Sequence, residues 1–169
     1  MTGVDRDSGE SEKSKSGSIS HAAESRSGGY VLVDGATKLT GRCETNSRAD
    51  KAVIAKPIRL ESDSASVRCS CRGGERAASV ALTGSGDELA GTLETSSGRY
   101  SVKSLHEVDK GAEPGGPTGY RVDGARPIGA VDVLYPGGAW LDPKLDEAER
   151  RELACVFAGL MLYDAPQPE

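Results

Sequence analysis

The sequence predicts a mainly β protein, in which an antiparallel β-barrel or sandwich-like body encloses one apolar C-terminal α-helix and follows a disordered N-terminal tail. Three observations lead to this fold class. The first residues are polar and lack aromatic side chains, many short β-type runs separated by turn residues come next, and a strongly apolar helical pattern ends the chain. A length of 169 residues suits a single folded domain, which we place at residues 30–169.

The tail comprises residues 1–29, which contain eight Ser, five Gly and no aromatic residue. Such a segment buries too little apolar area to offset the entropy lost on ordering, so it is predicted to be disordered. Charged residues between positions 5 and 12 also interrupt the apolar run that a secretory signal needs. The longest apolar run elsewhere, residues 153–163, is shorter than the roughly 20 residues that span a bilayer. We therefore expect no transmembrane segment and a cytoplasmic location.

Short strand patterns occupy the body of the chain. Two of them are hairpin signals, each with an Asp-Gly turn, at residues 34–35 and 123–124. The two segments share Gly-Tyr and Val-Asp-Gly-Ala, and we favour two merely similar hairpins over the alternative of an internal repeat, because Asp-Gly hairpins recur by chance. Further strand patterns lie at residues 52–55, 58–60, 66–69, 78–82, 88–93 and 99–105, and residues 110–117 are expected to form a longer loop. Short strands at this spacing predict an antiparallel sandwich or barrel.

The C-terminal pattern predicts a helix over residues 147–163. Asp146 is a good N-cap residue, and Glu149 three positions later completes a capping-box sequence. Residues 153–163 are apolar on every side of the predicted helix, which requires the body to surround it. We expect three of its side chains to be fully buried: Leu153, Phe157 and Leu160.

The end of the chain resembles a known superfamily. Strand patterns at residues 119–122 and 128–131 are followed by an Asp-rich turn at 139–146 and by the apolar helix, which stops at 164. This order resembles the C-terminal part of the phospholipid scramblase and tubby C-terminal-like superfamily, which includes the LURP-one-related proteins. The resemblance implies a closed antiparallel barrel around a hydrophobic helix, and a lipid or lipid-like ligand.

Charge and motifs favour a non-enzymatic binding or scaffold module. The net charge of -5, with a pI near 5.2, excludes the large basic surface that binds nucleic acid. We identify no catalytic residues and expect no cofactor, but a small-molecule ligand or a protein partner. Trp140, between Gly137-Gly138 and the helix, is the candidate ligand-binding residue. The interpretation that the sequence favours for Trp140, however, is a plug at the end of the barrel, where Pro143 and Leu145 also pack.

The cysteines suggest an alternative function. Cys69 and Cys71, together with Cys43 and His106, have the residue types of a Cys₃His zinc site. Alternation along a strand places Cys69 and Cys71 on one face, so simple packing in a reducing compartment explains them too. Cys155, within the apolar helix, is interpreted as a packing residue. A small Cys/His-dependent enzyme, a zinc-binding protein and a subunit of a larger assembly are therefore the alternatives to a binding module.

Overall fold

A computed structural model describes residues 4–16, 19–55, 58–85, 88–106, 117–134 and 137–162 of the chain. This part forms one antiparallel sheet in which the strands follow one another in chain order, and one C-terminal helix. The prediction of a mainly β protein with a single C-terminal helix is confirmed. The elements are β1 (Val4–Ser16), β2 (Ile19–Asp34), β3 (Thr37–Ala55), β4 (Ile58–Gly73), β5 (Arg76–Ser85), β6 (Glu88–Glu94), β7 (Arg99–Leu105), β8 (Gly119–Asp123), β9 (Pro127–Asp132), β10 (Gly138–Leu141) and α1 (Glu147–Leu162).

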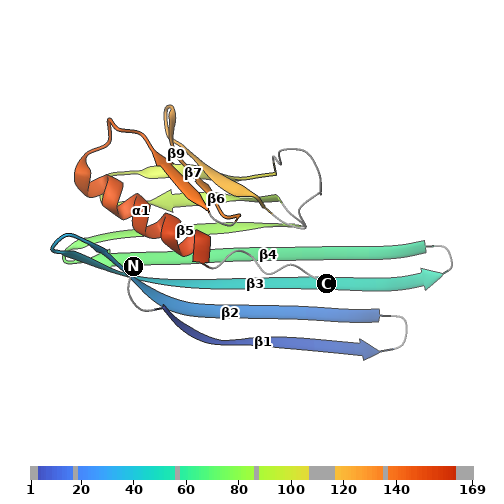
Figure 1. Cartoon of the computed structure of the whole chain (residues 1–169). Helices are drawn as coiled ribbons and strands as arrows, with labels where there is room; N and C mark the ends of the chain where they lie inside the picture. Colours follow the sequence, from blue (N-terminus) through green and yellow to red (C-terminus); the bar gives the residue numbers. More distant parts are fainter. Residues whose placement is uncertain are drawn as a thin grey trace.

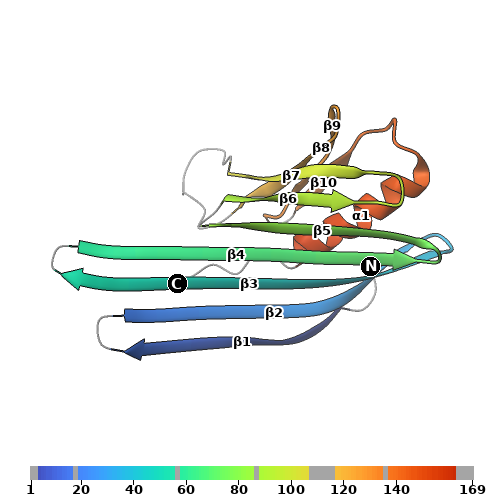
Figure 2. The same ribbon diagram turned by 180° about the vertical axis from the view of Figure 1, so that it is seen from behind.

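The sheet curls into a half-barrel around α1 (Figure 1). Strands β1 to β4 are long and extend well past the helix, whereas the shorter strands β5 to β10 curve over it, as the view from behind also shows (Figure 2). The helix contacts β2 to β5 on one side of the curl and β9 and β10 on the other. Within the described residues the sheet is open, with β1 and β10 as its edges, unlike the closed barrel that the family resemblance implies.

The core lies between α1 and the inner face of the sheet. Leu153, Phe157 and Leu160 are each at most 1% exposed, as predicted. The strands contribute alternate residues to the same core, because successive side chains of a strand point to opposite faces. Ala154 and Ala158 are only partly buried, since the half-barrel does not cover that side of the helix.

The start of α1 is capped as predicted, but without the reciprocal half of a capping box. The Oδ1 atom of Asp146 accepts a hydrogen bond of 2.8 Å from the backbone N–H of Glu149. The Glu149 carboxylate turns toward the sheet instead, where it accepts hydrogen bonds from the hydroxyls of Tyr100 and Thr95. The predicted last residue, Tyr163, and the stop after it lie outside the described residues.

Both predicted Asp-Gly hairpins are present, with their loops displaced by one residue. Asp34 pairs with Thr37, so the loop consists of Gly35 and Ala36, and Gly35 has a φ of 59°. The loop between β8 and β9 covers residues 124–126 and contains a hydrogen bond of 2.9 Å from Gly124 N to Arg126 O. The Asp-Gly pattern therefore predicted where each hairpin lies, whereas the strand register determines which residues form its loop.

The described residues of the predicted tail lie at the start of the sheet. Its described residues form β1 and the first part of β2, paired in register with the sheet. Among the residues whose burial is described, the buried hydrophobic side chains begin at Tyr30. One of the tail's contacts with β3 is polar: His21 and Asp50 are hydrogen-bonded at 2.8 Å, and His21 and Arg48 hold the pKa of Asp50 below its usual value. The pairing of β1 and β2 is made through backbone hydrogen bonds, which do not depend on apolar side chains.

Substitution at Gly159 tests the close approach of α1 to the sheet. A Cβ atom there would lie 2.5 Å from Tyr30 Oη and 2.6 Å from Cys43 Sγ. Gly159→Ala should lower the free energy of unfolding by about 1–2 kcal/mol, because overpacking outweighs the better helix propensity of Ala. Gly138→Ala is the matched control, since a Cβ atom there meets nothing within 4 Å. Chemical denaturation checks both, and an equal or higher stability of Gly159→Ala would contradict this packing.

Candidate functional site

The four cysteines form two disulfides in the core. Cys43 and Cys69 are register partners on β3 and β4, and their Cα atoms are 4.1 Å apart. Cys71, on the same face of β4, is bonded to Cys155 of α1, with a Cα–Cα distance of 6.2 Å. All four side chains are buried and none is a free thiol. The second bond therefore ties the helix covalently to the inner face of the sheet.

These disulfides replace the predicted zinc site. Disulfide sulfurs do not supply the thiolates that zinc needs, and His106 is exposed just past the end of β7, away from the cysteines. In the described residues, no group of three or more His, Cys, Asp or Glu side chains is placed to hold a metal ion. The prediction that Cys69 and Cys71 share a face was correct. The sequence analysis interpreted Cys155 as a packing residue and did not predict that it bonds to Cys71 on that face.

A serine–histidine contact exists at the end of β7. The Ser104 hydroxyl lies 3.0 Å from His106 Nε2 and accepts a hydrogen bond of 2.9 Å from Leu89 N. An activated serine also needs a group that orients the histidine, and no such bond to His106 is found within the described chain. The contact therefore lacks the third group of a catalytic triad.

Trp140 lies on the outer face of the half-barrel, near its edge. Its neighbour Leu141 faces inward, where it and Phe157 approach Gly129. Alternation along β10 turns Trp140 to the opposite face, and its side chain is 51% exposed. The favoured interpretation of Trp140 as a barrel plug is therefore wrong, because a plug would be buried.

A surface concavity of about 920 Å³ surrounds the exposed indole ring. Its lining consists mainly of small and apolar residues, and we call it the Trp140 surface: Leu105, Thr118, Gly119, Ala130, Val131, Asp132, Leu134, Gly138, Ala139 and Trp140. Leu134 is 41% exposed, so two of the three exposed large hydrophobic residues of the described chain gather here. The sequence pointed to Trp140 alone, because its neighbours on the surface come from other strands.

One carboxylate belongs to the Trp140 surface. Asp132 Oδ1 accepts a hydrogen bond of 2.9 Å from Leu134 N, which fixes the side chain and leaves its charge exposed to solvent. In register with Trp140 on the outer face lie Ala130 on β9, Arg121 on β8 and Lys103 on β7. Arg121 is paired with Asp123 at 2.8 Å. The Trp140 surface therefore has an exposed indole ring and one carboxylate, that of Asp132, among its lining residues.

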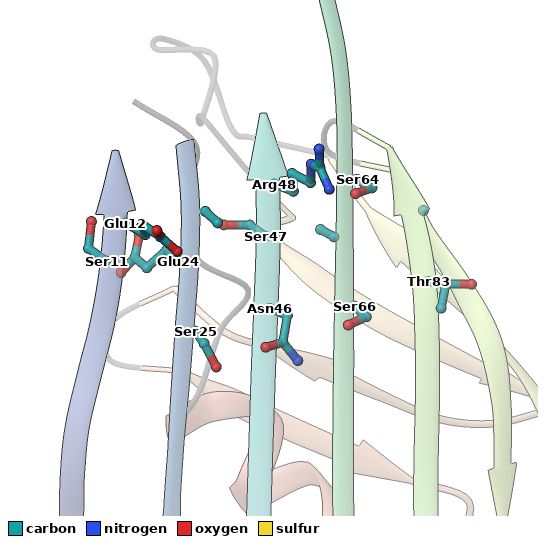
Figure 3. A pocket seen from close by; sticks show the side chains of 13 residues that line it. Ser11, Glu12, Glu24, Ser25, Asn46, Ser47, Arg48, Ser64, Ser66 and Thr83 are labelled. Atoms are coloured by element: carbon teal, nitrogen blue, oxygen red, sulfur yellow. The ribbon is translucent and has the colours of Figure 1, made fainter. Parts of the chain in front are cut away.

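A second concavity of about 830 Å³ lies over strands β1 to β5 (Figure 3). Four of its residues form one cross-strand row: Ser25, Asn46, Ser66 and Thr83. Cys43 and Cys69 face the helix, so the row belongs to the opposite face. The nearby Arg48 is paired with Asp50 at 2.9 Å. This concavity offers hydroxyl and amide groups but no exposed aromatic side chain.

The buried acids at the start of α1 have a structural role. Glu152 accepts hydrogen bonds from Ser96 N at 2.8 Å and from Arg76 Nη1 at 3.2 Å. Burial, with the hydrogen bond to Glu149, raises the pKa of Tyr100 to about 12, so its hydroxyl stays protonated and donates. Both glutamates thus anchor the helix to the turn between β6 and β7.

Comparisons with known proteins add no assignment: no family model, curated protein or solved structure matches the chain. In the described part of the chain, α1 is too short and too charged at its start to cross a membrane as a helix.

Removing the helix-to-sheet disulfide should destabilise the protein. Cys71 and Cys155 are 84 residues apart, and closing a loop of that length stabilises the folded state by about 4.5 kcal/mol in the chain-entropy model. Cys71→Ala/Cys155→Ala should lower the free energy of unfolding by that amount, measured by denaturant unfolding. The control Cys43→Ala/Cys69→Ala opens a separation of 26 residues and should lose about 1 kcal/mol less. Unchanged stability in the first variant would show that the bond does not tether α1.

Proposed function

We propose that the protein is a non-enzymatic binding module, and that it binds a lipid or lipid-like molecule at the Trp140 surface. The observation that carries this proposal is the gathering of Trp140 and Leu134, both exposed, around a floor of small residues. Exposed apolar surface that is concave and rimmed by polar groups is typical of ligand contacts. The family resemblance is the source of the ligand class and remains a prediction.

The charge of the site favours a zwitterionic or cationic headgroup. Asp132 attracts a positive group, and the face of an indole ring attracts a quaternary ammonium ion. The net charge of -5 opposes anionic lipids over a longer range. A short-chain phosphatidylcholine therefore combines the two features that the site selects, an apolar chain and a choline group.

The location proposed for this function is an oxidising compartment rather than the predicted cytoplasm. Every cysteine of the chain is in a disulfide, and such bonds persist outside the reducing cytosol. Thiol labelling of protein isolated directly from its cells tests this proposal. Four reactive thiols after unfolding would favour the cytoplasm, whereas no reactive thiol before reduction supports the oxidising compartment.

Fluorescence of Trp140, which is the chain's one tryptophan, reports ligand binding directly. Titration with dihexanoylphosphatidylcholine below its micelle concentration should shift the emission to shorter wavelengths in a saturable way, because the chain covers the ring. Gly138→Leu should weaken binding at least tenfold, since its side chain fills open space in the floor of the surface.

Val33→Leu is the matched control, because Val33 is an exposed hydrophobic residue outside the Trp140 surface, and it should bind like the wild type. Free phosphocholine, as a second probe, separates headgroup recognition from chain recognition. Equal responses of the wild type and Gly138→Leu would place binding elsewhere and contradict the proposal.

A subunit of a larger assembly is the second candidate function. One observation favours it: β10 is an edge strand of the described sheet, and three of its four residues are exposed. Edge strands present unpaired backbone groups that other chains can join.

A further inference from the structure

The hydrogen bonds between β9 and β10 show which backbone groups of β10 are free to pair with another strand. Asp142 N donates a hydrogen bond of 2.9 Å to Ile128 O, which marks these two residues as a hydrogen-bonded pair between β9 and β10. Antiparallel strands alternate between bonded and non-bonded pairs, which makes Trp140 the next residue bonded to β9. The N–H and C=O groups of Ala139 and Leu141 therefore point away from β9, along the free edge. Nothing in the described part of the chain bonds to them.

The two edges of the described sheet differ in how they are protected. The sequence of β1 contains seven charged residues among thirteen, which is how natural edge strands discourage pairing. The sequence of β10 is Gly-Ala-Trp-Leu and contains none. The edge without charge is also the one that carries the exposed Trp140.

We propose that β10 pairs antiparallel with β10 of a second copy of this chain, forming a two-fold dimer with one continuous sheet. This inference rests on the proposed binding role of the Trp140 surface and names a partner for its edge. An N–H and a C=O group are available on each side of Trp140, at Ala139 and at Leu141. A two-fold axis at Trp140 therefore places Ala139 of each copy opposite Leu141 of the other. Each pair exchanges two hydrogen bonds, and all the available groups are then used.

This register also pairs the two indole rings. Trp140 faces Trp140 of the second copy as a non-hydrogen-bonded pair, in which Cα atoms approach to about 4.5 Å. Both side chains lie on the outer face, where cross-strand aromatic pairs stabilise a sheet beyond the effect of burying their area. Ala130, beside Trp140 on β9, leaves room for the rings. The ligand would then lie over a floor made of two rings.

The test measures molecular mass and Trp140 emission over a wide range of protein concentration. The wild type should rise from 17.6 kDa toward twice that mass, and its emission should shift to shorter wavelengths over the same range. Ala139→Pro should remain monomeric, because proline lacks the N–H group that the pairing uses while the bonds to β9 stay intact. Ala139→Ser keeps that group and should dimerise like the wild type.

Trp140→Lys provides a second variant that does not depend on the backbone. The two lysines would face each other at the axis and repel, and the exposed position should tolerate the change without unfolding. A wild type that stays monomeric, or an Ala139→Pro variant that dimerises like the wild type, would overturn the pairing.

Lipid binding separates this inference from the proposed function. A monomeric wild type that still binds dihexanoylphosphatidylcholine would refute the dimer alone. A dimer whose Trp140 emission does not respond to that lipid would refute the lipid site alone.

Discussion

The packing of α1 into the curl of the sheet is the interaction on which the rest of the structure depends. Tyr30 Oη donates a hydrogen bond of 2.8 Å to the carbonyl of Cys155, and Gly159 lets the helix approach that same tyrosine. On the other side of the curl, Phe157 lies against Gly129. The helix therefore joins early and late strands that are far apart in the sheet, and its apolar surface is what the half-barrel forms around.

The position of the helix also decides which side chains become available on the outside. Because alternate residues of β9 and β10 face α1, the residues between them, Ala130 and Trp140, face solvent. The sheet ends at β10, so the exposed ring lies beside an unprotected edge. The proposed ligand contact and the proposed strand pairing thus both depend on Trp140 lying on the last strand of the described sheet.

The sequence predicted the parts of the fold that depend on local patterns. The helix, its Asp146 cap and its three buried residues follow from apolar spacing and capping chemistry, and both hairpins follow from Asp-Gly turns. The long strands were not predicted to their full length, because residues 44–51 and 61–65 are mostly polar and extend the strands by pairing with their neighbours. Register is a property of the whole sheet, which a single segment does not encode.

The candidate site was predictable only in part. Trp140 is recognisable from its flanking glycines, whereas Leu134 and Asp132 join it through the geometry of the loop and strands around it. The disulfides were missed for a similar reason. The pairing of Cys71 with Cys155 depends on the helix lying across β4, which no spacing in the sequence indicates.

Removal of the helix tests the central claim most directly. A chain that ends at Asp146 should lose cooperative unfolding and bind hydrophobic dyes, because the inner face of the half-barrel is then uncovered. Cys71→Ala/Cys155→Ala in the full chain is the control, since it removes the disulfide but keeps the packing, and it should still unfold cooperatively. A truncated chain that unfolds cooperatively, as stably as this control, would show that the sheet does not depend on α1.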